Sequence, residues 1–117
     1  LHTEKSRSVL PDAYSRADVV YSLSRAIVTF AALVNSDADM LKVIDDKLHQ
    51  PYRKPLIKGY DDVAAAFEKA GAISHFLSGA GPTIMGLFKF DADVVLPRGW
   101  TLRKLFIEQN GVSVKEI

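Results

Sequence analysis

The chain has 117 residues, of which 48% are hydrophobic and 25% are charged, and its formal net charge is +1. This length and composition suit one globular domain with its own core, and they exclude a disordered chain. The small charge gives no field for a polyanion, so we expect no nucleic-acid partner, and the absence of cysteine excludes disulfides and thiolate metal sites.

Two helices are predicted in the first half of the chain. From Ala17 to Asn35 apolar residues recur at helical spacing, and Asp18 suits the first turn. We interpret this segment as the core helix of the domain. A second helix is predicted from Asp37 to Leu48.

A proline-containing segment follows the second helix. Pro51 and Pro55 predict that residues 48–57 stay out of a helix. His49, which precedes Pro51, is interpreted as a residue that satisfies carbonyls at a helix C-terminus. A third helix is predicted from about Tyr60 to Ala70, with Gly71 as the residue that ends it.

The periodicity changes after the third helix. Ala72–Leu77 and Ile84–Phe88 are short apolar segments that flank a polar loop, as an antiparallel pair of strands would. Helices followed by antiparallel strands indicate an α+β fold rather than a parallel sheet. Towards the end, residues 91–99 are ambiguous, a helix is predicted over Trp100–Gln109, and a last strand over Val112–Ile117.

The loop between the two predicted strands is the segment Ser78-Gly79-Ala80-Gly81-Pro82-Thr83. Its glycines permit positive φ and close approach to the backbone, and its hydroxyls and amides can converge on an anion such as a phosphate. A second interpretation is a hairpin loop whose glycines serve only the turn. The loop by itself does not decide between them.

Metal and membrane functions are not expected. The three histidines lack metal-ligand spacing, and the acidic pairs Asp45-Asp46 and Asp61-Asp62 are interpreted as solvated charges and helix caps. We expect no signal peptide from these residues, and the longest apolar stretch, Ala26–Val34, is too short to span a bilayer. We therefore expect no membrane partner and a cytoplasmic location.

Three motifs together resemble one protein family. They are Thr-x-x-x-Arg-x-x-Leu-Pro at residues 3–11, His-Gln-Pro-Tyr-Arg at residues 49–53, and the glycine loop at residues 78–83. In this order and spacing they resemble the C-terminal part of the homoserine kinase family, within the GHMP small-molecule kinases. The resemblance covers residues 1 to about 90 and fades after Phe90.

The resemblance implies a fold and an organisation. Residues 1–117 would form a GHMP kinase C-terminal domain, with a ferredoxin-like arrangement of helices packed on an antiparallel sheet. The strand that precedes the first motif in this family is missing here, and Leu1 in place of Met indicates a fragment of a longer two-domain kinase. A vacant strand position would leave backbone groups that need partners, so a homodimer stays open.

The resemblance also implies a site. Arg7 and Arg53 align with arginines that hold the carboxylate of L-homoserine, and a guanidinium offers a planar fork that matches a carboxylate. The loop would help to shape the ATP site through Ser78, Gly79, Ala80, Gly81 and Thr83. No catalytic residue and no metal ligand is assigned.

ATP and Mg²⁺ would be held mainly by the N-terminal domain of the kinase. The family's main phosphate loop, Pro-x-x-x-Gly-Leu-Gly-Ser-Ser-Ala, does not occur in these 117 residues. We therefore expect the fragment alone to be inactive. Two alternatives remain open: a free-standing small-molecule-binding or regulatory module, and the C-terminal domain of a GHMP kinase that phosphorylates another alcohol.

Overall fold

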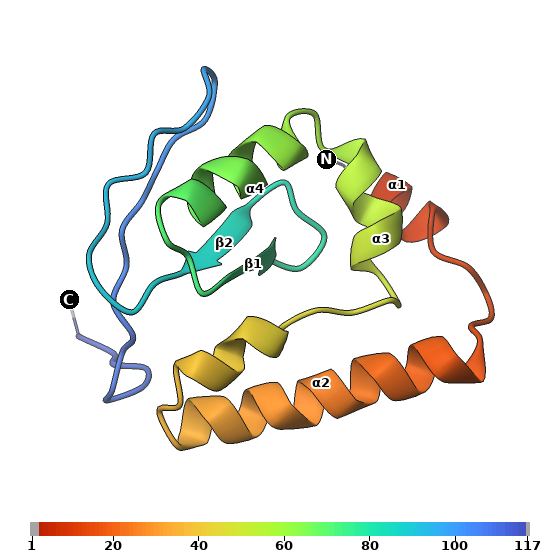
Figure 1. Cartoon of the computed structure of the whole chain (residues 1–117), viewed down its shortest axis with the longest axis horizontal. Helices are drawn as coiled ribbons and strands as arrows, with labels where there is room; N and C mark the ends of the chain where they lie inside the picture. Colours follow the sequence, from red (N-terminus) through yellow and green to blue (C-terminus); the bar gives the residue numbers. More distant parts are fainter. Residues whose placement is uncertain (1–2, 117) are drawn as a thin grey trace.

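The structure, a computed structural model, describes residues 3–116 and consists of helices around a small antiparallel sheet (Figure 1). The two longest helices are α2, with 19 residues, and α4, with 10 residues. In chain order the elements are α1 (Thr3–Ser8), α2 (Arg16–Val34), η1 (Asp39–Val43), α3 (Gln50–Arg53), η2 (Lys54–Leu56), α4 (Tyr60–Lys69), β1 (Ser74–Leu77) and β2 (Ile84–Leu87).

The sheet and α4 form the centre of the fold. Strands β1 and β2 are antiparallel, with Leu77 opposite Ile84, next to the loop. Helix α4 packs on the sheet so closely that a Cβ on Gly86 would lie 2.8 Å from Phe67 Cδ1. The predicted strand pair and the α+β class are confirmed, although the sheet has two strands among the described residues.

The buried core lies between α4, the end of β1 and the segment before α4. It contains Ile57, Tyr60, Ala64 and Leu77, with Ile84 and Trp100 packed against it. Helix α4 ends as predicted: Gly71 has a φ of +89°, and its N–H donates to Glu68 O at 3.0 Å. Short-range sequence signals were therefore sufficient to predict where this helix ends.

The N-cap residue of helix α2 is Ser15, whose hydroxyl accepts a hydrogen bond from the Asp18 N–H at 3.1 Å. The predicted helix is confirmed, but its assignment as a core helix was wrong. It packs on η1 through one side, and only Ser22 and Ala32 are buried. The apolar stripe predicted to be core is exposed at Val20, Leu23, Ile27, Phe30 and Val34, because α2 packs mainly on η1 and leaves this side uncovered.

This stripe borders an open groove of about 400 Å³ between α2 and β1, which Phe30, Leu33, Phe76 and Leu77 help to line. Helix α2 also has a mean hydropathy of 1.5 over 18 residues. It is therefore long and apolar enough to cross a membrane by length and composition alone, contrary to the expectation drawn from Ala26–Val34. Core helices of soluble proteins share these properties.

The proline segment differs from its prediction. Residues 50–53 form α3 and residues 54–56 form η2, with Pro51 and Pro55 in their first turns. Proline is favoured there because the first N–H groups of a helix need no intrahelical partner. The helix predicted over Asp37–Leu48 is also wrong in extent, since only Asp39–Val43 is helical and Ile44 is extended at a ψ of 109°.

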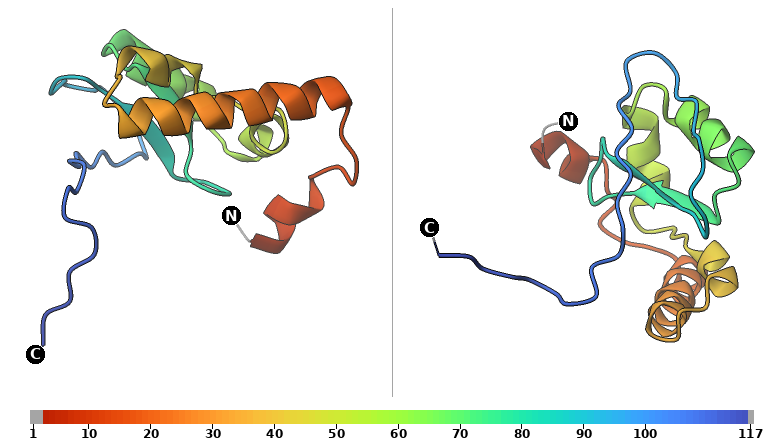
Figure 2. Two further views of the ribbon diagram at one scale, coloured as in Figure 1. Left: turned by 90° about the horizontal axis from the view of Figure 1, so that it is seen from below. Right: turned by 90° about the vertical axis from the view of Figure 1, so that its left-hand side faces the viewer.

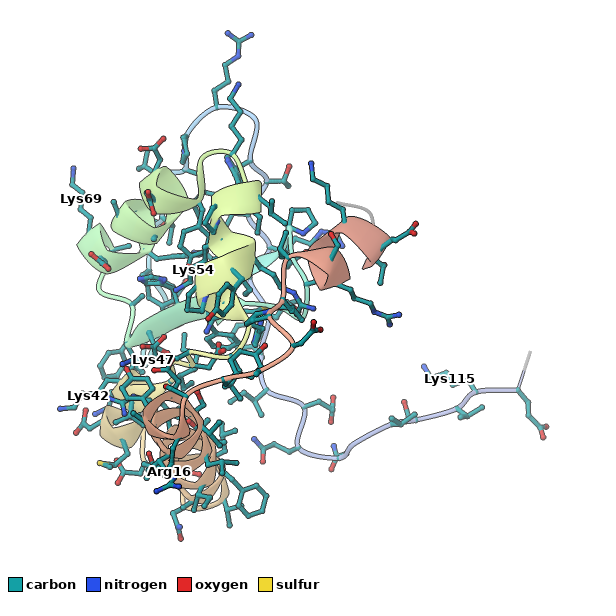
Figure 3. All side chains as sticks on the ribbon, turned by 90° about the vertical axis from the view of Figure 1, so that its right-hand side faces the viewer. Arg16, Lys42, Lys47, Lys54, Lys69 and Lys115 are labelled. Carbon is teal, nitrogen blue, oxygen red and sulfur yellow. The ribbon has the colours of Figure 1, made fainter. Side chains whose placement is uncertain are left out.

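The C-terminal segment contains no helix or strand over residues 88–116. Trp100 packs against the core, and only the last part of the segment leads away from the other elements, as the position of Lys115 shows (Figures 2 and 3). The helix predicted over Trp100–Gln109 and the strand predicted over Val112–Ile117 are therefore not formed in the described part, and residue 117 lies outside it. Leu105 and Phe106 are exposed. Without a packing surface, neither a short helix nor an unpaired strand is stable.

Candidate functional site

The first and second motifs meet where α1 contacts α3. The Nε–H of Arg53 donates to the carbonyl oxygen of Ser6 at 3.1 Å, and Ser6 is fully buried. Arg7, the next residue, is exposed on α1. The side chain of Arg53 is thus hydrogen-bonded to the backbone beside Arg7, although the two arginines are 46 positions apart in sequence.

The start of α3 is fixed by Asp46. Its Oδ1 accepts from the backbone N–H groups of Leu48, His49 and Gln50 at 2.8, 2.7 and 3.4 Å. Burial by itself would raise the pKa of Asp46, but these backbone bonds, the Gln50 side chain and nearby His49 outweigh it and lower the pKa. Asp46 therefore stabilises the turn that leads into α3, although His49 occupies the N-cap position and makes no side-chain capping bond.

The guanidinium of Arg53 has a second neighbour in His49. Its Nη1 lies 3.4 Å from His49 Nδ1, and His49 Nε2 lies 3.3 Å from Asp46 Oδ2, which lacks a well-aligned hydrogen bond among the described residues. The interpretation of His49 as a helix C-terminal residue was wrong, because it directly precedes α3. Its carbonyl accepts from the N–H groups of Tyr52 and Arg53.

These contacts leave part of the Arg53 guanidinium available. Of its five N–H donors, Nε–H is used by Ser6, and one on Nη1 faces His49. The remaining donors on Nη1 and Nη2 form the outer end of the planar fork, the geometry suited to bidentate recognition of a carboxylate. Arg53 is half-buried, so a bound anion would be partly shielded from water.

The third motif is tied to the same helix through Gln50. This residue is only 4% exposed, and its Oε1 accepts from the backbone N–H of Leu77 at 2.9 Å. Leu77 ends β1, directly before the glycine loop. Figures 1 and 2 show this loop on the side of the sheet where α1 and α3 lie.

The glycine loop is held by two backbone hydrogen bonds: the Ser78 N–H donates to Thr83 O at 2.9 Å, and the Gly81 N–H donates to Ser78 O at 3.1 Å. Gly79 and Gly81 have φ values of +60° and +79°, and the Gly81–Pro82 peptide bond is cis. Both glycines thus adopt the positive φ values that a tight turn requires.

The two glycines differ in their surroundings. A Cβ on Gly81 would lie 2.6 Å from Ile57 Cδ1, so the core occupies that space, whereas a Cβ on Gly79 would meet nothing within 4 Å. Ser78, Gly79 and Thr83 are exposed, and Ala80 is half-buried. The face of the loop at Gly79 is therefore the one open to an anion.

The described residues offer no group of three or more His, Asp or Glu side chains that could hold a metal ion. The residues present fit a contribution to an anion site. Sequence reasoning missed Gln50 as a residue that organises this site, and it interpreted Asp46 only as a solvated charge or helix cap. For Asp46 a signal existed, because an acidic residue shortly before Pro51 is typical of a helix start.

The comparisons with known proteins show the family to which the chain belongs. The family model described as "GHMP kinases C terminal" matches residues 22–98. A homoserine kinase from Picosynechococcus is 44% identical over 88 residues, which cover 74% of this chain and 29% of that protein. A homoserine kinase from Crocosphaera subtropica is 36% identical over an alignment of 126 positions, which covers 97% of this chain and 41% of that protein.

The Crocosphaera match includes most residues after Phe90, where the resemblance was expected to fade. A crystal structure of homoserine kinase from Cytophaga hutchinsonii matches with a TM-score of 0.70 and 30% identity, covering 74% of this chain and 28% of that one. The chain thus spans about three tenths to two fifths of the length of these relatives. By its sequence and its fold, the chain belongs to the GHMP kinase C-terminal family.

Proposed function

We propose that this chain is the C-terminal domain of a homoserine kinase, which transfers the γ-phosphate of ATP to the hydroxyl group of L-homoserine in threonine biosynthesis. The observation that carries the proposal is the joining of three motifs at α3. Arg53 binds the backbone beside Arg7, and Gln50 binds the strand end beside the glycine loop. The relatives reported above, all homoserine kinases, support the same acceptor.

In this proposal Arg53 and Arg7 hold the carboxylate of homoserine. The outer fork of Arg53 fixes the plane of the carboxylate, while Arg7 adds a second positive charge from the exposed side of α1. Two such contacts orient the acceptor so that its hydroxyl is presented to the nucleotide. Orientation of this kind is a main source of catalysis in phosphoryl transfer.

The glycine loop, from Ser78 to Thr83, lines the nucleotide side of the site. ATP supplies the phosphoryl group, and Mg²⁺ supplies charge neutralisation when bound. The residues of this loop fit a supporting role only, because it contains no carboxylate or basic side chain. Most contacts to ATP and Mg²⁺ are assigned to parts of the kinase outside these 117 residues, and a cytoplasmic location belongs to the same proposal.

The proposal is tested with the full-length protein. ADP formation from ATP is measured with L-homoserine and with homoserinol, which keeps the hydroxyl group but lacks the carboxylate. We expect ADP formation that depends on L-homoserine and much slower turnover of homoserinol. Equal turnover of both alcohols would assign another acceptor within the GHMP kinases, and binding without turnover would favour a regulatory module.

A further inference from the structure

The side chain of Gln50 is buried and belongs to neither the proposed substrate contacts nor the hydrophobic core. It is 4% exposed at the first position of α3. A buried amide is costly unless its polar atoms find partners, and Gln50 Oε1 finds one in the Leu77 N–H at 2.9 Å, in another element of the fold. A residue of this kind fixes the relative position of two segments.

The two segments are those that carry the proposed site. Arg53 lies three residues after Gln50, about one helical turn along α3. Leu77 precedes Ser78, the first residue of the glycine loop. A shift of Gln50 would therefore change the position of Arg53 relative to the glycine loop.

Gln50 itself is held firmly on the α3 side. Its backbone N–H lies 3.4 Å from Asp46 Oδ1, and its side chain is one of the groups that lower the pKa of Asp46. The carboxylate of Asp46 also holds the N–H groups of Leu48 and His49. The position of the amide oxygen that faces Leu77 is thus set by the start of the helix.

We propose that Gln50 is a positioning residue that holds the acceptor-binding arginine and the glycine loop at the distance required for phosphoryl transfer. This inference rests on the proposed function. Gln50 does not touch the reacting groups. It acts by keeping Leu77, and with it the loop, in register with α3.

The test uses the full-length protein with Gln50→Met. Methionine has a similar length and removes the acceptor oxygen for the Leu77 N–H. Gln109→Met makes the same exchange at an exposed position of the C-terminal segment and serves as the control. For each protein kcat, KM for L-homoserine and the thermal midpoint are measured.

Hydrogen exchange of two backbone amides provides a readout independent of activity. The Leu77 N–H is bonded to Gln50, while the Ile73 N–H is bonded to Leu87 O at 2.7 Å in the same sheet. In Gln50→Met we expect Leu77 to exchange faster than in wild type while Ile73 is unchanged. Global destabilisation would instead accelerate both amides.

We expect Gln50→Met to lower kcat/KM for L-homoserine about 10- to 100-fold, the scale of small misplacements of reacting groups. Gln109→Met should resemble wild type. Unchanged Leu77 exchange in Gln50→Met, or faster Leu77 exchange with normal kcat/KM, would overturn the inference. A wild-type protein without homoserine-dependent ADP formation would contradict the proposed function, and Leu77 exchange would still decide whether Gln50 holds the loop.

Discussion

Arg53→Lys tests the proposed carboxylate contact most directly. Lysine keeps the positive charge but has no planar fork, and its single ammonium group cannot serve the Ser6 carbonyl and a substrate carboxylate in the way the guanidinium does. Loss of a hydrogen bond to a charged group costs about 1.5–3 kcal/mol. This free energy corresponds to a rise of roughly 10- to 150-fold in KM for L-homoserine.

The assay is steady-state ADP formation by the full-length enzyme, with L-homoserine and ATP varied separately. KM for ATP should change little, because Arg53 is assigned to the acceptor. Arg16→Lys, at the exposed start of α2, is the matched control (Figure 3). An Arg53→Lys enzyme with the homoserine KM of wild type would refute the carboxylate role, and an equal rise in both KM values would indicate a general distortion of the site.

Three further outcomes are expected. Gly79→Asn should lower turnover, because the new side chain enters the open space in front of the loop. It should cost little stability, because asparagine tolerates a φ of +60°. The control Gly71→Asn, at another exposed glycine with positive φ, should keep normal turnover. Because the pKa of Asp46 is lowered, its stabilisation is complete above pH 3.8, the ordinary value, and is lost as the pH falls through the folded pKa. Thermal midpoints of wild type and Asp46→Asn should therefore converge on acidification, and parallel curves would exclude this role. The 117-residue chain alone should form no ADP with L-homoserine, and robust turnover would contradict the assignment of ATP binding to other parts of the kinase.

The features that the sequence predicted well depend on short-range signals. Helix α4 has apolar residues at helical spacing and a glycine that ends it, and the strand pair has short apolar segments around a glycine loop. These patterns act within a few residues of each other, so no knowledge of the rest of the fold is required.

Two of the predictions that failed concern features that depend on contacts with residues far away in the sequence. The apolar stripe of α2 was correctly seen as helical, but whether Leu23 and Phe30 are buried depends on the surface that faces them. The same holds for the segment after Trp100. Helix α3 failed for another reason: the prolines were interpreted as breakers, although Pro51 occupies the helix start, where proline is favoured.

The candidate site shows the same division. Arg53 and the glycine loop were found from motifs. The Gln50–Leu77 bond joins residues 27 positions apart, and a contact of that kind is visible only in the folded chain. Gly81 is a further example, because the proximity of Ile57 Cδ1 gives a packing reason for a glycine that the motif explained by turn geometry and substrate approach.

The uncovered stripe of α2 has a consequence for work on the 117-residue chain in solution. Large contiguous apolar patches are rare on soluble monomers, and two copies that pair their stripes would remove Ile27, Phe30 and neighbouring side chains from water. We therefore expect the isolated chain to self-associate as its concentration rises. Its melting temperature should then increase with protein concentration, so that a single melting curve would measure association together with folding.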